Sequence, residues 1–318
     1  MTKLRIRHLL VAGGAGFLGS AFVRDRLRAD QEIEITALDA LRRPAAEADL
    51  ADLADDQRFT LVQGDIRDVG LVERLAGGVD AIVNFASEEV ADGPALARTD
   101  VEGTAVLLEV ARKFRHQRFL LASTDEVYGP PRSVPSREED RPAPYSITAA
   151  ARAAAETLAT AYHASQEVPV LITRGVAAYG PRQPVSQLVG RLITSALSDQ
   201  ALVIDGDGSG SRDYLHVDDQ VAAIARVLWK GEPGAVYNIG SGSQVSIGQL
   251  ADMILHLCGK PSSLKHFRKD ERSWSFATET RRMKPLGWEP RMTLSEGLRS
   301  TIDWYRANPS AWRQPAAA

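Results

Sequence analysis

The alternation of short apolar runs with longer amphipathic runs constrains the fold of this 318-residue chain more than any other feature. Six apolar runs are predicted to be strands, at residues 7–13, 34–40, 59–65, 80–86, 118–124 and 168–175. Four amphipathic runs between them are predicted to be helices, at residues 16–30, 68–77, 99–114 and 146–166. Strands that alternate with helices of this length form βαβ units. Right-handed crossovers place helices on both faces, so we expect an α/β fold with a doubly wound parallel sheet.

The regular alternation ends after the sixth predicted strand. Beyond it, short strands and helices are separated by longer, turn-rich loops. Ser246 is placed to cap one of these helices. Thr293, with Glu296 three residues later, predicts a capping box at the last helix. We therefore expect two parts, residues 1–175 and a smaller C-terminal lobe at residues 176–318 that is partly interleaved with the first.

A glycine-rich turn joins the first predicted strand to the first predicted helix. Gly13, Gly16 and Gly19 allow a tight turn and let the backbone approach a pyrophosphate group. The free N–H groups at the start of the helix would face that group. Asp39 ends the second predicted strand, where its carboxylate can accept from both ribose hydroxyls and repel a 2'-phosphate. The pattern predicts a Rossmann-type NAD-binding domain at residues 1–175.

Other residues near this turn bear on the choice of dinucleotide. Arg42 and Arg43 follow the acidic residue closely and weaken the preference for NAD over NADP. Asp65 and Ile66 follow the third predicted strand, where they suit the amino group and the face of an adenine. A strand-ending aspartate and a core isoleucine explain these two residues equally well.

Composition argues against several other classes of function. The net charge of -3 leaves no basic surplus to neutralise phosphates, so nucleic acid is not expected as a partner. The single cysteine, Cys258, permits no disulfide framework, which fits a reducing cytoplasm. No apolar stretch is long enough to span a membrane. We expect a cytoplasmic protein that uses no metal and no membrane.

Three longer motifs resemble one family. The glycine spacing with a later Tyr145 resembles the extended short-chain dehydrogenase/reductase superfamily. STDEVYG at residues 123–129 is similar to the signature of the dTDP-glucose 4,6-dehydratases. YGPRQ and GDGSGSRDYLHVDD, farther along, resemble motifs of that family's substrate-binding domain. The resemblance covers residues 8–305 and implies an NAD-dependent nucleotide-sugar dehydratase whose lobe at 176–318 binds a dTDP- or UDP-hexose.

The resemblance also implies roles for individual residues. In these enzymes a sugar is oxidised at C4, loses its C5 proton and its C6 hydroxyl, and is reduced at C6. By resemblance Thr124 orients the sugar, Asp125 is the acid and Glu126 is the base. Tyr145 handles the proton of the C4 hydroxyl. The implied cofactor-binding residues are Gly13, Gly16, Phe17, Leu18, Asp39, Asp65, Ile66, Phe85, Ala86 and Tyr145. The implied substrate-binding residues are Ser87, Glu88, Gln187 and Arg212, the last being the candidate for the diphosphate.

The acid and the base can also be argued from chemistry. Removal of a proton next to a ketone needs a base, and expulsion of hydroxide needs a proton donor. Adjacent carboxyl groups in one closed site, such as Asp125 and Glu126, ionise unequally, so one can serve as acid and the other as base. They follow a predicted strand, at the edge where α/β sheets bind ligands. A solvated turn after the strand is the alternative interpretation.

The chain departs from the superfamily at one catalytic position. The tyrosine is usually followed four residues later by a lysine, which favours ionisation of the phenol and holds the nicotinamide ribose, but Ala149 stands there. Arg152 lies three residues farther along the same helical face. Its guanidinium could take over the ribose contact, but a solvated charge on the helix is the favoured interpretation. Asp100 also replaces an asparagine of the family.

Three functions stay open at this point. The first is a nucleotide-sugar 4,6-dehydratase, supported by the joint presence of the threonine, the two carboxyl groups and the tyrosine. The second is a nucleotide-sugar epimerase that uses the same transient oxidation without loss of water. The third is an NAD-binding protein with weak or no catalysis. By resemblance, the helices at 100–114 and 148–165 would pair two chains into a homodimer, with packing against the sheet as the alternative.

Overall fold

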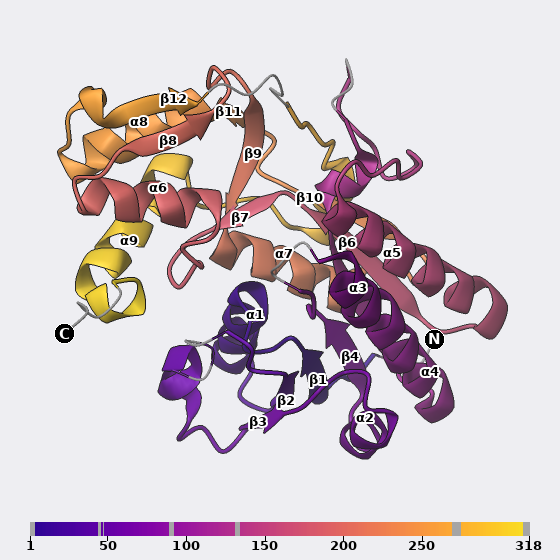
Figure 1. The fold of residues 1–318 in the computed structure, drawn as a ribbon. Helices are drawn as coiled ribbons and strands as arrows, with labels where there is room; N and C mark the ends of the chain where they lie inside the picture. Colours follow the sequence, from indigo (N-terminus) through magenta and orange to yellow (C-terminus); the bar gives the residue numbers. More distant parts are fainter. Residues whose placement is uncertain are drawn as a thin grey trace.

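The computed structural model describes residues 4–43, 46, 48–88, 92–130, 134–268 and 275–313. Its main element is a seven-stranded parallel sheet with the strand order β10-β6-β5-β4-β1-β2-β3 (Figure 1). The strands are β1 (His8–Ala12), β2 (Glu34–Asp39), β3 (Phe59–Gln63), β4 (Ala81–Asn84), β5 (Arg118–Thr124), β6 (Val170–Gly175) and β10 (Val236–Ile239). The chain runs outward from β1 in both directions, which leaves a crevice at the carboxyl ends where the order reverses, between β1 and β4.

Helices cover both faces of this sheet. One face packs against α1 (Phe17–Ala29) and α7 (Val217–Lys230), and the other against α2 (Val69–Ala76), α4 (Gly103–Phe114) and α5 (Ile147–Gln166) (Figure 1). Successive strand side chains point to opposite faces. Leu9 and Val11 of β1 therefore join the apolar core on the α1 side, and Leu10 and Ala12 join the core on the α5 side. The two cores make the fold a doubly wound α/β structure, as the sequence predicts.

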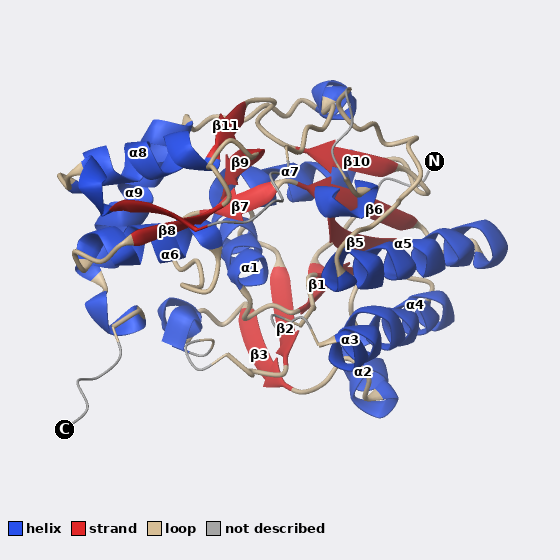
Figure 2. Ribbon diagram, turned by 45° about the horizontal axis from the view of Figure 1, so that its top comes forward, coloured by secondary structure: helices blue, strands red, loops and turns tan. Residues whose placement is uncertain are grey.

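A second group of elements forms a lobe beside the sheet (Figure 2). It contains the strand groups β11-β9-β7 and β12-β8. Its elements are β7 (Ala177–Tyr179), α6 (Leu188–Leu197), β8 (Leu202–Asp205), β9 (Ser211–His216), β11 (Gln244–Ser246), α8 (Ile247–Cys258), β12 (Lys265–Arg268) and α9 (Leu294–Ala307). They enclose a third apolar core that includes Leu192, Ile254 and Ile302. Between β9 and β11 the chain returns to the main sheet as α7 and β10, so the lobe is interleaved with the sheet.

Two of the predicted helix starts are confirmed in detail. Ser246 Oγ accepts from the Gln249 amide at 3.2 Å, and the Gln249 side chain accepts in return from the Ser246 amide, which makes a capping box. Thr293 and Glu296 form the predicted capping box at α9. These local hydrogen bonds depend on residues three apart, which is why the sequence alone reveals them.

One predicted helix is wrong in its form. The continuous helix expected over 99–114 is divided into α3 (Gly93–Leu96), a π-helical segment (Ala97–Glu102) and α4. Asp100 lies in the π-helical segment with its carboxyl group buried, where it accepts from Ser87 Oγ at 2.9 Å. The wider turn and a buried polar contact occur together here, and π-helical turns are frequent at functional sites.

Candidate functional site

The glycine turn lies at the carboxyl edge of the sheet, between β1 and α1. Gly13 has a φ of +73°, and its amide donates to Leu38 O at 2.8 Å. A Cβ atom at Gly13 would lie 2.6 Å from the Ala86 nitrogen, and one at Gly19 would lie 2.1 Å from Gly13 O. Both positions therefore require glycine. Gly16 is the N-cap of α1, and no described side chain caps it, so the first N–H groups of the helix can face an anion.

Asp39, at the end of β2, is held by the backbone on both oxygens. Its Oδ2 accepts from the Ala15 amide at 2.9 Å, and its Oδ1 accepts from the Leu41 amide at 2.9 Å. Each carboxylate oxygen keeps a further lone pair for a ligand hydroxyl. This is the arrangement that a ribose with two free hydroxyls would need.

The two arginines near Asp39 are engaged in ion pairs. Arg42 pairs with Glu88, and its Nη2 lies 3.4 Å from Asp65 Oδ2. Arg43 Nη1 lies 2.6 Å from Asp49 Oδ2. Guanidinium groups that already face carboxylates are less available to a 2'-phosphate. The geometry therefore favours NAD over NADP. In the sequence alone, the two nearby arginines had weakened that preference.

A cavity of about 340 Å³ follows the carboxyl ends of β1 to β4. Nine predicted site residues line it: Gly13, Gly16, Asp39, Asp65, Ile66, Phe85, Ala86, Ser87 and Glu88. Six further lining residues carry no sequence signal that would predict them: Ala15, Leu38, Ala40, Ala46, Gly64 and Thr99. Most of these contribute backbone or a small side chain, so only their nearness to the predicted residues could have indicated them. The glycine turn and the acidic residue together fit a dinucleotide.

Two residues predicted to bind substrate line this cavity, and three residues predicted to bind the cofactor are absent from its described lining. Ser87 and Glu88, predicted to bind substrate, share the cavity lining with the predicted cofactor residues. The described lining does not include Phe17 or Leu18, which begin α1. It does not include Tyr145 either, whose side chain is 60% exposed just before α5. Their roles stay predictions.

The predicted acid–base residues lie at the end of β5, the neighbour of β4. Thr124 Oγ1 accepts from the Glu126 amide at 3.3 Å and lies 3.5 Å from Asp125 Oδ1. Asp125 is buried, whereas the side chain of Glu126 is 34% exposed. Burial, and secondly the charge of Glu126, raise the pKa of Asp125 from 3.8 to about 7. Asp125 can therefore keep its proton near neutral pH and act as a proton donor.

A residue of the C-terminal lobe reaches the same place. Arg212 of β9 places Nη1 2.5 Å from Glu126 Oε1, and its guanidinium lies 4.7 Å from the ring centroid of Phe276. The contact joins the lobe to the carboxyl pair at the end of β5. The diphosphate role of Arg212 stays a prediction. Gln187, the N-cap of α6, is exposed and accepts from Gln183 Nε2 at 2.9 Å, and its substrate role stays a prediction too.

The structure corrects the interpretation of Arg152. Its side chain is only 14% exposed, so the solvated helix charge that the sequence favoured is wrong. Nη1 donates to Ala86 O at 3.3 Å and to Ala122 O at 3.2 Å. Nε lies 3.4 Å from Asp100 Oδ2. The guanidinium thus joins the loop after β4 to β5.

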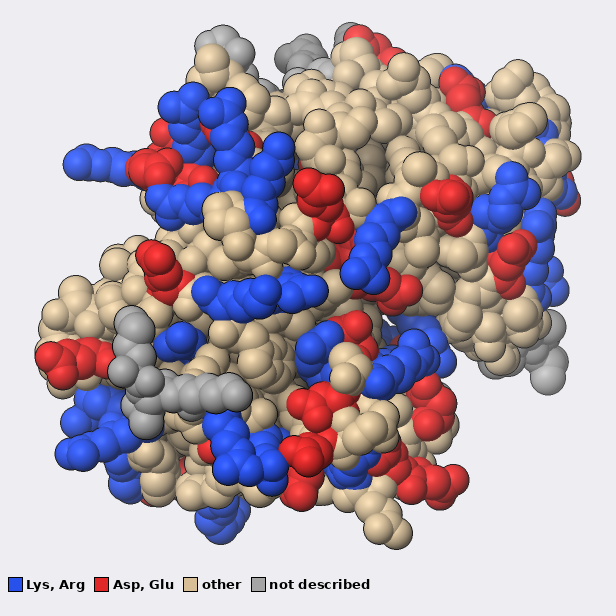
Figure 3. Space-filling model, turned by 180° about the vertical axis from the view of Figure 1, so that it is seen from behind, with Lys and Arg blue, Asp and Glu red and all other residues tan. Residues whose placement is uncertain are grey.

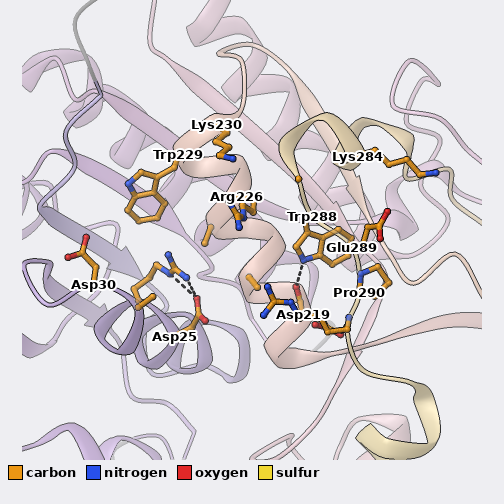
Figure 4. Close-up of a pocket in the computed structure, with 16 residues that line it drawn as sticks. Asp25, Asp30, Asp219, Arg226, Trp229, Lys230, Lys284, Trp288, Glu289 and Pro290 are labelled. Carbon is orange, nitrogen blue, oxygen red and sulfur yellow. Dashed lines mark hydrogen bonds and ion pairs between the residues drawn. The ribbon is translucent and has the colours of Figure 1, made fainter.

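A larger cavity lies away from these residues. It measures about 900 Å³ between α1, α7 and the segment 284–291 (Figure 4). Arg26 pairs with Asp25 at its rim, and the Arg26 guanidinium lies 5.4 Å from the ring centroid of Trp229. None of the predicted site residues lines it. The carboxyl ends of β1 to β5 remain the better candidate for the site.

Charge and topology give no sign of other ligand classes among the described residues. The face in Figure 3 carries basic and acidic side chains side by side. The described residues contain no group of His, Cys, Asp and Glu arranged to hold a metal ion. No described helix combines the length and the apolar character needed to cross a membrane.

Comparisons with known proteins agree with this geometry. The model of the NAD dependent epimerase/dehydratase family matches residues 9–240. A dTDP-glucose 4,6-dehydratase from Streptomyces niveus is 38% identical over 322 residues, which cover 96% of this chain and 95% of that protein.

Two solved structures extend the agreement to three dimensions. The dTDP-glucose 4,6-dehydratase of Bacillus anthracis, in complex with NAD, has a TM-score of 0.92 at 35% identity and covers 96% of this chain and 98% of its own. A UDP-glucuronic acid 4-epimerase from Bacillus cereus, in complex with UDP-glucuronic acid and NAD, has a TM-score of 0.89 at 27% identity and covers 94% and 99%. The fold class, the NAD cofactor and the family predicted from the sequence are confirmed. This chain belongs to the NAD-dependent epimerase/dehydratase family.

Proposed function

We propose that this protein is a nucleotide-sugar 4,6-dehydratase that acts on a dTDP- or UDP-hexose. The observation that carries the proposal is the pair of adjacent carboxyl groups after β5, whose surroundings differ. Asp125 is buried with a pKa near neutrality, and Glu126 beside it has its negative charge balanced by Arg212. One carboxyl group can therefore donate a proton while its neighbour accepts one, next to the cofactor cavity.

The proposed reaction gives each of these groups a proton-transfer role. NAD, when bound, would supply the oxidation at C4 and the later reduction at C6. The Tyr145 phenolate accepts the proton of the C4 hydroxyl, and Glu126 removes the proton at C5, which the C4 ketone acidifies. Asp125 gives its proton to the C6 hydroxyl, which leaves as water, and a proton that has exchanged with solvent returns to C5 through Glu126 when C6 is reduced. Thr124, hydrogen-bonded to this pair through its Oγ1, is placed to orient the sugar.

The relatives support the substrate class. The S. niveus relative and the B. anthracis structure are named for dTDP-glucose, and the B. cereus structure contains UDP-glucuronic acid. The last of these is a 4-epimerase, so a nucleotide-sugar epimerase that uses the same transient oxidation is the second candidate function. If such an epimerase acted at C5, the same two carboxyl groups would exchange the C5 proton, but no proton would be delivered to the C6 hydroxyl.

We also propose a homodimer formed through α4 and α5. These helices lie side by side on one flank of the sheet (Figure 2), joined by a hydrogen bond of 3.4 Å from the Tyr162 hydroxyl to Glu109 Oε2. Ala150, Ala154 and Ala161 are exposed on one side of α5. Small side chains permit close approach of a second helix.

Mass spectrometry in D₂O tests the function. The purified protein is incubated with dTDP-glucose or with UDP-glucose, and the expected product lacks one water molecule and carries one deuteron. A sugar that gains deuterium at unchanged composition would favour the epimerase. The Asp125→Asn variant should lose the dehydrated product, and Asp207→Asn, an exposed aspartate of the lobe, should keep it.

A further inference from the structure

The buried side of α5 carries its cation two helical turns after Tyr145 rather than one. Ala149, at the position of the usual lysine, is 1% exposed and presents only a methyl group. Arg152 follows on the same face of the helix, and its side chain lies between α5 and the sheet. A positive charge is therefore present in this region, but from a different position in the chain.

The guanidinium of Arg152 connects the cofactor cavity with β5, the strand that leads to the carboxyl groups. The Ala86 carbonyl that it contacts belongs to a residue lining the cavity. The Ala122 carbonyl lies within β5, two residues before Thr124. A planar guanidinium can donate in several fixed directions at once, whereas an ammonium group acts more nearly as a point charge.

Asp100 extends this connection to a second residue of the cavity wall. Its carboxyl group is buried, pairs with Arg152 and accepts from Ser87 Oγ. Burial raises the pKa of Asp100, and the charge of Arg152 opposes that rise. A buried carboxylate needs such a partner. Ser87 and Ala86, neighbours in the cavity lining, are thus held by one ion pair.

We propose that Arg152, together with Asp100, is a positioning residue that replaces the missing lysine. The pair fixes the Ala86–Ser87 wall of the cofactor cavity relative to β5. Because the pair is formally neutral, it acts through geometry rather than by favouring ionisation of Tyr145. The proposal concerns NAD binding, so it depends on the proposed function only in experiments that measure conversion of a sugar.

A second buried ion pair on α5 provides a matched control. Glu156 pairs with Arg174 of β6 at 2.6 Å, and their side chains are 4% and 5% exposed. The Arg174 guanidinium lies over the ring of Tyr128, and neither partner lines the cofactor cavity. Removal of this pair shows how far the loss of a buried ion pair on α5 by itself changes NAD affinity.

The experiment compares the two double variants Asp100→Asn/Arg152→Met and Glu156→Gln/Arg174→Met. Each removes both charges, so neither leaves an unpaired buried ion. NAD affinity is measured by calorimetry, and thermal unfolding shows that the variants are folded. We expect the first variant to bind NAD at least tenfold more weakly than the unmodified protein, and the second to bind it equally well.

Two more variants keep the test decisive if a double variant does not fold. Arg152→Lys retains the ion pair but not the planar fork, and we expect unchanged unfolding with NAD affinity reduced several-fold. Ala149→Lys with Arg152→Ser and Asp100→Asn rebuilds the usual arrangement, and we expect NAD affinity to recover toward that of the unmodified protein.

The outcomes separate this proposal from the proposed function. If Arg152→Lys and the Asp100/Arg152 double variant bind NAD as tightly as the unmodified protein, the positioning role is overturned, whatever sugar the protein converts. If NAD affinity falls as expected but no nucleotide sugar is converted, the proposed function fails and the positioning role stands.

Discussion

The burial of Asp125 raises its pKa and so sets the pH range in which it can act as the acid. Its pKa of about 7 means that the carboxyl group loses its proton as the pH rises through neutrality. Only the protonated form can give a proton to the departing C6 hydroxyl. We predict that the rate of water loss at saturating sugar falls about tenfold per pH unit well above pH 7. A rate that stays constant to about pH 9 would rule out Asp125 as the acid.

The same burial predicts a change in stability. Between pH 3.8 and about 7 the native Asp125 keeps a proton that the unfolded chain loses, so this group's contribution to stability falls as the pH rises through that window. The shift of about three pKa units corresponds to roughly 4 kcal/mol. We predict that Asp125→Asn raises the free energy of unfolding at pH 8, with a gain that disappears below about pH 4. Urea denaturation at both pH values measures this. Equal stability of both proteins at pH 8 would contradict it.

Asp39 lines the cavity with its carboxylate held by two backbone amides. If it accepts from the ribose hydroxyls as predicted, its charge would repel a 2'-phosphate. We predict that Asp39→Asn improves the affinity for NADP relative to NAD by about tenfold, or roughly 1.4 kcal/mol. Asp303→Asn, which removes the same charge from α9, is the control. Affinity ratios that are equal in the two variants would show that Asp39 does not select the cofactor.

Single residues were predictable where local spacing defines them. The places of Gly13, Gly16 and Asp39 in the cavity lining could be predicted because strand, turn and helix fix their relation within one βαβ unit. The contacts of Arg152 could not be predicted, because its partner Asp100 is distant in sequence and its two carbonyl partners lie in the loop after β4 and in β5. Helical spacing shows which face a residue shares, but not whether that face meets solvent or a buried carboxylate.

The elements with a clear apolar pattern were predictable, whereas α7 and β10 of the main sheet were not. The six strands from β1 to β6 follow the predicted runs closely. α7 was not predicted, because buried Asp219 and Gln220 interrupt its apolar pattern. Asp219 Oδ2 accepts from the amides of Arg291 and Met292 at 3.0 and 2.9 Å, which are tertiary contacts. β10 was not predicted either, and it depends on pairing with β6.

The exposed side of α5 makes the proposed dimer testable. Ala154 lies in the middle of this side, and an arginine there would prevent close approach of a second helix. We predict that Ala154→Arg converts a dimer into a monomer in light-scattering measurements of mass, with the far-UV spectrum unchanged. Ala307→Arg, at the exposed end of α9, should leave the mass unchanged. A dimer that persists with Ala154→Arg would place the interface elsewhere.

At the scale of the whole molecule, the candidate site is assembled from both parts of the chain. The cavity comes from loops after β1 to β4, the carboxyl pair from β5, and Arg212 from the lobe. The sequence motifs, by their resemblance to one enzyme family, predicted that these segments contribute to a single site. They could not predict the contact between Glu126 and Arg212, which are 86 residues apart. Such a contact depends on how the lobe is seated on the sheet.

The central claim is that the cofactor cavity and the carboxyl pair act on one sugar. Transfer of a label within that sugar tests it most directly. dTDP-glucose that carries deuterium at C4 is converted by the purified protein in ordinary water, and the product is examined by NMR. The account predicts a dehydrated product with the deuterium at C6. A dehydrated product without the label, or no dehydrated product from any dTDP- or UDP-hexose while NAD is bound, would contradict it.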